Sequence, residues 1–267
     1  MVAVSLLSQK GGVGKTTLAL NLALSFARRG SRTLLIDADP QGAIGLSLGG
    51  KAREAPGLYA HLAQSAAWES VLLPTREANL VLLPSGDVRV EHLDDWATRL
   101  SSEATLAEVV RSAAREFDVV LVDTPAGVTG PAAAAAAAAG NVLIPLQAEP
   151  LSLRTLPRVL ECVGHWRSQG KQISVAGVVL TMSAFRNETA LAVLEEAWGL
   201  YPELVLETHV PRDDAMAQAS AAGVPVGLLR RRSPPVASVF DAMASELTTR
   251  LGIITEEEEN APRSLLD

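Results

Sequence analysis

The sequence predicts a doubly wound α/β fold, in which a mostly parallel β-sheet is flanked by helices on both faces. Short and nearly continuous apolar runs recur along the 267-residue chain, and segments with helical periodicity separate them. Such runs are typical of strands buried on both faces, and their alternation with helices produces right-handed βαβ units. The candidate strands are residues 2–7, 33–36, 80–83, 119–122, 142–146, 173–180 and, with the weakest pattern, 205–209.

Length and composition predict one folded domain followed by an acidic tail. With 48% hydrophobic residues the chain can bury one large core, and nothing in the sequence requires a second domain. We therefore expect a single domain over residues 1–252. Residues 253–267 hold five acidic residues against one arginine, so they carry most of the net charge of −7. A segment of this composition is expected to be disordered and solvating.

Several protein classes are disfavoured by the composition. The chain has no signal-peptide pattern and no apolar run of 18 residues, so no membrane span is expected. The single cysteine, Cys162, excludes a disulfide framework within one chain and suggests a reducing compartment. We therefore expect a soluble, cytoplasmic protein.

A phosphate-binding loop is predicted directly after the first strand. Residues 10–17 read Lys-Gly-Gly-Val-Gly-Lys-Thr-Thr and precede a helical pattern over residues 18–29. Glycines let backbone N–H groups close around phosphate oxygens, and the opening helix directs its unpaired amides toward them. The residues expected to bind the nucleotide are Gly11, Gly12, Val13, Gly14, Lys15, Thr16 and Thr17.

Three side chains of this loop have specific expected roles. Lys15 should reach the β and γ phosphates, and Thr16 should ligate Mg²⁺ through its hydroxyl. Thr17 should contact the α phosphate. The predicted cofactors are therefore ATP and Mg²⁺.

Two further strands end in carboxylates. The strand at 33–36 is followed by Asp37-Ala38-Asp39-Pro40-Gln41, and the strand at 119–122 is followed by Asp123. Carboxylates at buried strand ends are costly without a cation or a donor nearby, and ligands of doubly wound sheets bind at these ends. Asp123 after four apolar residues forms a Walker B pattern and is expected to hold Mg²⁺ through its water shell. For the first pair, a turn or capping role is the alternative.

The glycine loop resembles the deviant Walker A motif of the ParA/MinD family of P-loop ATPases. Gln9 stands where the usual motif has its first glycine, and a second lysine, Lys10, opens the loop. Residues 37–41 resemble switch I of the family, residues 124–127 its switch II, and residues 210–213 its adenine loop. The resemblance extends from residue 1 to about residue 250 and implies a P-loop NTPase fold.

The resemblance implies roles for several residues. Lys10 would contact the phosphates across an ATP-sandwich homodimer, Asp39 would orient or polarise the attacking water, and Asp37 would support Mg²⁺ through water. The expected activity is a slow ATP hydrolase that a partner stimulates. The adenine would be held by Pro211, Arg212 and Asp213.

The biological role favoured by the resemblance is nonspecific binding of double-stranded DNA by the ATP-bound dimer, with release on hydrolysis. Small, Soj-like ParA partition ATPases act on the nucleoid in this way and lack an N-terminal DNA-binding extension, as we expect here. Arg186 matches a position where ParA-type proteins carry a DNA-binding arginine, but a second such position holds Ala215. A second candidate contact, with a solvated loop as its alternative, is the run Arg230, Arg231 and Arg232.

The implied partner is a ParB-like or cargo-adaptor protein, and the cargo could be a plasmid, a chromosome or a protein assembly. The alternative is a MinD-like or other positioning ATPase that acts on a membrane or a protein scaffold. Anionic lipid would repel the acidic end of the chain, so no membrane anchor is expected. Metallocluster relatives need further cysteines besides Cys162.

Overall fold

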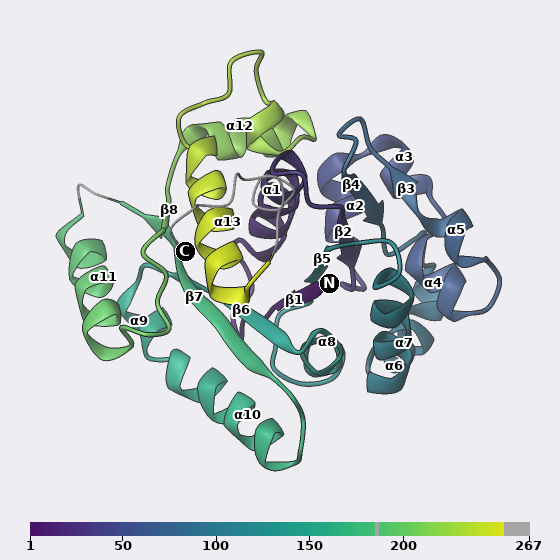
Figure 1. Ribbon diagram of the computed structural model, residues 1–267, viewed down its shortest axis with the longest axis horizontal. Coiled ribbons are helices and arrows are strands. Elements are labelled where there is room, and N and C mark those ends of the chain that lie inside the picture. Colours follow the sequence, from purple (N-terminus) through teal and green to yellow (C-terminus); the bar gives the residue numbers. More distant parts are fainter. Residues whose placement is uncertain (185–186, 254–267) are drawn as a thin grey trace, which may run out of the picture.

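The computed structural model describes residues 1–184 and 187–253 and has the predicted doubly wound α/β fold (Figure 1). Its described strands form an eight-stranded sheet in the order β3-β4-β2-β5-β1-β6-β7-β8. All of these neighbours are parallel except β3 and β4. The strands are β1 (Val2–Leu6), β2 (Thr33–Asp37), β3 (Leu73–Pro74), β4 (Leu80–Leu83), β5 (Val119–Asp123), β6 (Asn141–Gln147), β7 (Ser174–Ser183) and β8 (Val210–Pro211).

Helices cover both faces of this sheet (Figure 1). The α-helices are α1 (Lys15–Arg28), α2 (Ala43–Leu48), α3 (Gly50–Glu54), α4 (Gly57–Leu62), α5 (Trp68–Val71), α6 (Leu93–Leu100), α7 (Glu103–Ala113), α8 (Pro131–Ala139), α9 (Pro150–Leu153), α10 (Leu156–Ser168), α11 (Glu188–Leu200), α12 (Asp214–Ala222) and α13 (Ala237–Leu251). Two 3₁₀ turns are η1 (Val90–His92) and η2 (Val226–Leu228). Among the described residues, no helix has the length and apolarity needed to span a bilayer.

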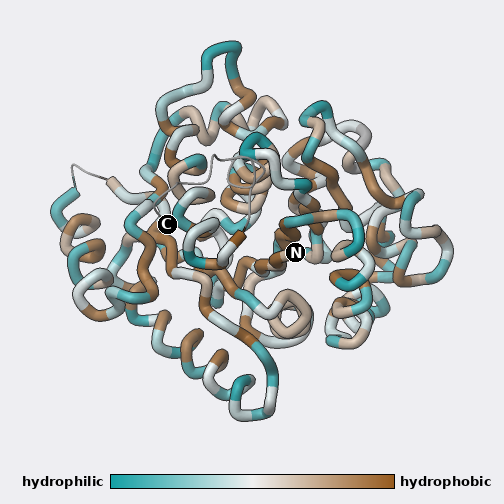
Figure 2. Tube along the Cα trace, in the orientation of Figure 1, coloured by the Kyte–Doolittle hydropathy of each residue, from teal (hydrophilic) through white to brown (hydrophobic). Residues whose placement is uncertain are grey.

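The core divides into two layers because the strands carry apolar side chains on both faces. Val4 and Leu6 of β1 pack with α1 and α13, whereas Ala3 packs on the opposite face with α7 and α8. Every residue of β2 and of β5 is buried. Most of the strand segments near the middle of Figure 2 are accordingly coloured as hydrophobic. The prediction of strands buried on both faces is confirmed.

The strand order places three predicted motifs at one edge of the sheet. β5 lies between β2 and β1, and β6 lies on the other side of β1, so the chain reverses its direction of winding at β1. Asp37 and Asp123 are partners in the parallel register of β2 and β5. The carboxyl ends of β1, β2 and β5 therefore adjoin, which is where ligands bind in open α/β sheets.

The prediction of a strand at residues 205–209 is wrong. Val205 makes an isolated bridge to Val178, and the strand itself is β8, which begins at Val210. The backbone N–H of Leu206 donates to the carbonyl of Val178 in β7 at 2.9 Å, but beyond this bridge the backbone of the segment also pairs with side chains. The Arg250 guanidinium donates to the carbonyl of Val205 at 3.1 Å, and the Glu246 carboxylate accepts from the backbone N–H of Thr208 at 3.1 Å. The antiparallel β3 was not predicted, because two residues that include a proline show no periodicity.

Candidate functional site

The predicted phosphate loop joins β1 to α1 in a conformation that requires glycine. Gly12 has φ 76° and Gly14, the residue before α1, has φ 88°. A side chain in this left-handed region costs roughly 1–2 kcal/mol. No side chain among the described residues caps α1, so its first-turn N–H groups are available to an anion.

Hydrogen bonds from other elements hold this loop in place. The Ser8 hydroxyl donates to the carbonyl of Lys10 at 2.8 Å. The Thr181 hydroxyl, at the end of β7, donates to the carbonyl of Val13 at 2.9 Å. Ser8 also accepts from the backbone N–H of Gly127, in the segment that follows β5. The loop is therefore tied to both neighbouring parts of the sheet.

Asp123 is fully buried at the end of β5, and neither of its carboxylate oxygens has a hydrogen-bond partner among the described residues. Burial raises the pKa of this carboxyl to about 7. The Thr16 hydroxyl faces it without reaching hydrogen-bond geometry and lowers the pKa, Asp39 raises it, and Lys15 lowers it. A buried carboxylate without a donor is destabilised until a cation approaches it.

Asp37 is also fully buried, but both of its oxygens are occupied. One accepts from the backbone N–H of Asp39 at 3.2 Å and the other from that of Ile44 at 3.0 Å. Burial, followed by the charge of Asp123, raises its pKa to about 8. Asp37 thus fixes the turn after β2 and the start of α2, which is the turn role that the sequence left open. Its support of Mg²⁺ through water stays a prediction.

Lys15 lies among these acids. Its residue is 8% exposed, burial lowers the pKa of its ammonium, and the charges of Asp123 and Asp39 oppose that shift. Asp39 itself is half-exposed, and its Oδ1 accepts from the backbone N–H of Gln41 at 2.8 Å. The structure therefore brings the predicted Lys15, Thr16, Asp37, Asp39 and Asp123 to one place.

The donor set of this site fits Mg²⁺ bound together with phosphate. Among the described residues there is no group of three or more His, Cys, Asp or Glu side chains that could hold a metal. Mg²⁺ needs no such group, because it commonly takes one or two protein oxygens, several waters and the substrate phosphates. Thr16 and Asp123 supply two hard oxygen donors next to the phosphate loop, and the unpartnered Asp123 carboxylate needs a cation.

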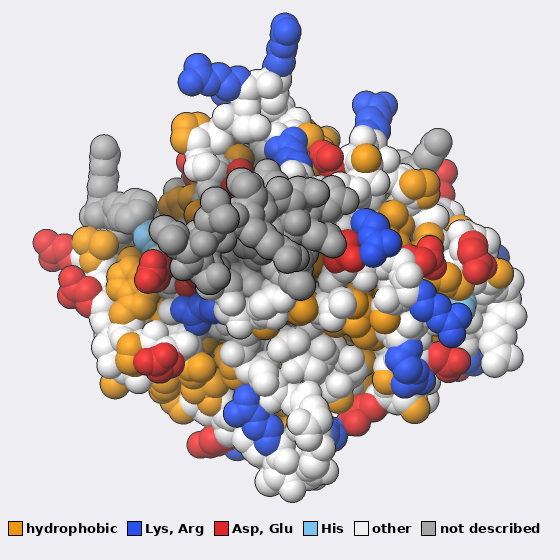
Figure 3. All heavy atoms as spheres, viewed as in Figure 1, with side chains coloured by type: hydrophobic (Ala, Val, Ile, Leu, Met, Phe, Trp, Pro, Cys, Tyr) orange, Lys and Arg blue, Asp and Glu red, His pale blue; other side chains and the backbone are white. Residues whose placement is uncertain are grey.

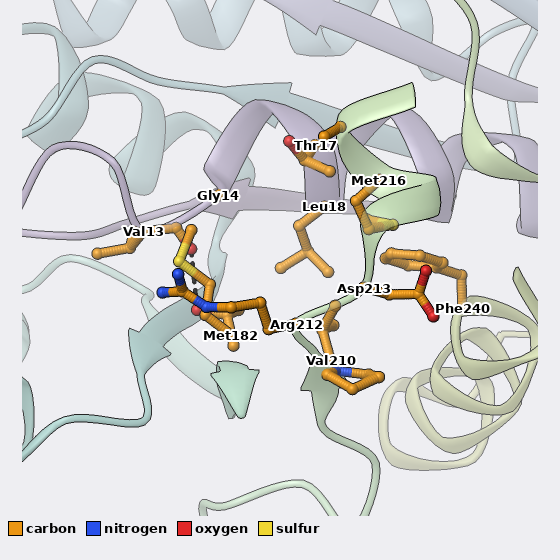
Figure 4. Close-up of a pocket in the computed structure, with 13 residues that line it drawn as sticks. Val13, Gly14, Thr17, Leu18, Met182, Val210, Arg212, Asp213, Met216 and Phe240 are labelled. Carbon is orange, nitrogen blue, oxygen red and sulfur yellow. Dashed lines mark hydrogen bonds between the residues drawn. The ribbon is translucent and has the colours of Figure 1, made fainter. Parts of the chain in front are cut away.

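Beside the phosphate loop lies an apolar cavity of about 260 Å³ (Figure 4). The predicted adenine residues Pro211, Arg212 and Asp213 line it, as do Thr17 and Thr181. The Asp213 side chain also caps α12 by accepting from the backbone N–H of Ala215 at 2.7 Å. Size and apolar lining suit a planar base.

Sequence reasoning missed most of the apolar lining of this cavity. Figure 4 shows Leu18, Met182, Met216 and Phe240 around it, and these residues come from four separate elements or element ends. Apolar side chains carry no chemical signature, so no motif could identify them. The exception is Met182, because the strand end Leu180-Thr181-Met182 resembles the place where the ParA/MinD family carries part of its base pocket. The φ of Met182, 56°, is unusual for a residue other than glycine.

Lys10 is half-exposed, and its ammonium donates to the Ser152 hydroxyl in α9 at 3.4 Å. The lysine therefore has a partner within its own chain. Its contact across a dimer stays a prediction.

The three adjacent arginines lie in residues 226–233, which comprise η2 and the start of the connection to α13; we call this segment the arginine loop. Arg230, Arg231 and Arg232 are all exposed, and Arg230 donates to the Gln218 side chain at 2.7 Å. Basic side chains project from this part of the molecule at the top of Figure 3. Arg186 and the acidic residues of the tail lie outside the described residues.

Comparisons with known proteins agree with this geometry. A family model described as an AAA domain matches residues 1–175. The chromosome partitioning protein ParA of Myxococcus xanthus is 34% identical over 246 residues, covering 91% of this chain and 86% of the relative. The chromosome-partitioning ATPase Soj of Treponema pallidum is 33% identical over 252 residues, covering 92% and 96%. The septum site-determining protein MinD of Pyrococcus horikoshii, solved with Mg-ADP, superposes with a TM-score of 0.76 at 25% identity, covering 94% of this chain and 98% of that one.

Proposed function

From the membership of this chain in the ParA/MinD family of partition ATPases, we propose that its ATP-bound state binds DNA and that hydrolysis ends this binding. The chain is an ATP hydrolase that uses ATP and Mg²⁺. In the proposed cycle, the ATP-bound form dimerises, binds DNA without sequence preference and releases it on hydrolysis. Such a cycle serves the partition of a plasmid or chromosome, or the positioning of a cargo.

The proposal rests on the proximity of Lys15, Asp39 and Asp123 to one another, beside the N-terminus of α1. No described side chain caps that N-terminus. Lys15 and the first-turn amides of α1 would bind the phosphates. Thr16 and Asp123 would hold Mg²⁺, which would offset the negative charge that develops on the β and γ phosphates. The base would enter the cavity lined by Met182, Met216 and Phe240 and the predicted adenine residues.

In the hydrolytic step, water attacks the γ phosphorus, the bond to the bridging oxygen breaks, and ADP and inorganic phosphate result. Asp39 is half-exposed at the edge of the buried site, where it would orient the attacking water. The carboxylate of Asp37 holds the backbone of this segment at Asp39 and at Ile44. Loss of the γ phosphate would therefore act on the backbone between Asp39 and Ile44, and the Asp37 carboxylate holds both ends of that stretch.

Dimerisation is proposed from the second lysine of the loop. Lys10 lies in the segment before the glycines and is half-exposed, so it is accessible to a second subunit. Its bond to Ser152 is long for a charged donor, at 3.4 Å, and would be exchanged for a phosphate contact.

DNA binding is proposed from the exposed arginines of the arginine loop. Nonspecific binding needs contacts to phosphates and no base readout, so adjacent guanidinium groups are sufficient. Arg230, Arg231 and Arg232 are exposed next to α12, whose first residues follow the adenine segment. Arg186 stays a second candidate. A ParB-like or other adaptor protein would stimulate hydrolysis and free the cytoplasmic protein from the nucleoid.

The likeness to MinD favours one alternative, in which the same switch acts on a membrane or a protein scaffold instead of DNA. The two functions differ in what the ATP-bound dimer binds, so a binding assay separates them.

The test is binding to a random-sequence duplex at moderate salt with ATP, ADP or no nucleotide, for the wild type and for Asp39→Ala, which should retain bound ATP. A triple arginine-to-glutamate variant at 230–232 is compared with a control triple variant, Arg111→Glu, Arg115→Glu and Arg158→Glu, at exposed sites on α7, after it and on α10. We expect ATP-selective, salt-sensitive binding that the first triple variant loses and the control retains.

Other outcomes refute parts of the proposal. Binding that survives the triple variant at 230–232 would move the contact elsewhere, and Arg186→Glu would be tested next. No binding in any nucleotide state, although the dimer forms, would exclude DNA and favour the membrane or scaffold alternative.

A further inference from the structure

A buried asparagine connects the nucleotide-binding turn of α1 to the arginine loop. Asn21 is 5% exposed. Its Nδ2 donates to the carbonyl of Thr17 at 2.7 Å, and its Oδ1 accepts from the backbone N–H of Val226 at 2.8 Å. Thr17 lines the base cavity, and Val226 is the first residue of η2. One side chain therefore contacts both the nucleotide end of α1 and the start of the arginine loop.

We propose that Asn21 is a positioning residue that couples the nucleotide state of the first turn of α1 to the order of the arginine loop. The inference rests on the proposed function, because the loop affects activity through the DNA contact assigned to its arginines. The coupling itself is observable without DNA.

The arginine loop is built as a unit that rests on α1. The Ser233 hydroxyl donates to the carbonyl of Gly227 at 2.8 Å and closes the segment on itself. Gly227 lies so close to α1 that a Cβ at this position would be 3.1 Å from the Leu24 side chain and 3.1 Å from the Arg28 guanidinium. Asn21, Leu24 and Arg28 follow one another at helical spacing, so a single face of α1 supports the loop.

On this face, Asn21 makes the polar connection that reaches the nucleotide end. The amide group uses its donor on one side and its acceptor on the other, so it cannot rotate without breaking both bonds. The carbonyl of Thr17 belongs to the turn whose N–H groups would bind phosphate. A shift of this turn on nucleotide binding would move Asn21, and with it the amide of Val226.

The same region also contacts the helix that follows switch I. Gly223, which ends α12, approaches the end of α2 so closely that a Cβ would lie 3.2 Å from the carbonyl of Leu48. The arginine loop follows α12 within three residues. The arginine loop therefore rests on α1 and follows directly after a helix whose end contacts α2, the helix after switch I.

The test is hydrogen–deuterium exchange of the amides of residues 226–233 in the full chain, without nucleotide, with Mg-ADP and with a nonhydrolysable ATP analogue. Two variants break the same bond from opposite sides. Asn21→Ala removes both hydrogen bonds of the amide. Val226→Pro removes the N–H donor and leaves Asn21 in place, and the extended Pro225 before it, with φ −57° and ψ 150°, accommodates a following proline.

Ser25→Ala is the matched control. Ser25 lies one turn further along α1, is 4% exposed and donates to the Asp241 carboxylate of α13 at 2.7 Å. The control therefore removes a buried hydrogen bond of α1 that does not reach the arginine loop. ATP affinity is measured for all variants, so that a loss of nucleotide binding is not mistaken for a loss of coupling.

We expect the wild type and Ser25→Ala to gain protection in residues 226–233 with the ATP analogue, and Asn21→Ala and Val226→Pro to lose that response while still binding ATP. The ratio of the DNA affinity with ATP to the DNA affinity with ADP should fall by roughly fivefold or more in Asn21→Ala and in Val226→Pro. A wild-type loop that does not respond to nucleotide, or a response that survives both variants, would overturn the coupling. A response that depends on Asn21, in a protein that binds no DNA, would support the coupling and refute the DNA function.

Discussion

Replacing Asp123 by asparagine should stabilise the protein when metal and nucleotide are absent, and should abolish its stabilisation by Mg-ADP. Asp123 is fully buried and neither oxygen has a partner among the described residues. The ionised carboxylate therefore destabilises the empty site. The asparagine side chain carries no charge there, but it can no longer attract the cation.

The size of the effect follows from the pKa of Asp123, which burial raises from 3.8 to about 7. At 1.36 kcal/mol for each pH unit, ionisation of this group opposes folding by up to roughly 4 kcal/mol. The amide of the new asparagine is itself buried, and an unsatisfied amide costs about 1–3 kcal/mol. The difference leaves the variant more stable by about 1–3 kcal/mol above neutral pH.

The sign of the pH dependence can be stated from the same shift. Because the pKa of the folded state lies above that of the unfolded state, the folded protein keeps a proton that the unfolded chain has lost. The stability of the wild type therefore falls as pH rises from near 4 to about 7, and the advantage of Asp123→Asn grows over that interval. Below about pH 4 the charge contribution disappears and the wild type should be the more stable of the two.

The assay is urea denaturation in a chelator at about pH 5 and about pH 8, repeated with Mg-ADP. Asp118→Asn, at the other end of β5, is the matched control. The Arg32 guanidinium hydrogen-bonds to Asp118 and lowers the pKa of its carboxyl, so this variant should lose up to ~1 kcal/mol equally at both pH values. An Asp123→Asn protein that is less stable than wild type at the higher pH, or whose advantage does not change with pH, would refute the reasoning.

Three further predictions concern the phosphate loop. Thr181→Val leaves the buried carbonyl of Val13 without its partner. We therefore expect the free energy of unfolding to fall by about 1–3 kcal/mol and ATP binding to weaken. The control Thr248→Val removes a hydroxyl that is bonded within α13 and should leave ATP binding unchanged. Lys15→Ala should abolish ATP binding in a calorimetric titration, because the lysine is the buried cation of the site, and an unchanged affinity would remove its phosphate role. Gly14→Ala forces a side chain into φ 88°, and thermal denaturation should show a loss of roughly 1–2 kcal/mol; an unchanged stability would contradict the assigned loop geometry.

Local patterns were sufficient to predict most strands and the phosphate loop. Apolar runs such as residues 33–36 and 119–122 are short, β-branched and buried on both faces, so their period and composition lead to a single conformation. The segment at 205–209 has the weakest apolar pattern, because Glu207 and His209 interrupt it, and part of its backbone bonds to side chains of α13 that lie 38 or more residues away in sequence. A pattern within five residues contains no information about such a distant partner.

The sequence by itself determined the predicted chemistry of this protein, because the residues predicted to bind phosphate and the carboxylates at strand ends are set by local spacing. Only the tertiary structure decided how those residues differ. The Asp37 carboxylate accepts from two backbone N–H groups, whereas the carboxylate of Asp123, its register partner, has no hydrogen-bond partner among the described residues. The cavity beside the phosphate loop likewise combines residues from Val13 to Phe240, and the bridge through Asn21 joins two residues that are 205 positions apart. Burial and hydrogen-bond partnership arise from the packing of distant elements, and no local sequence pattern encodes them.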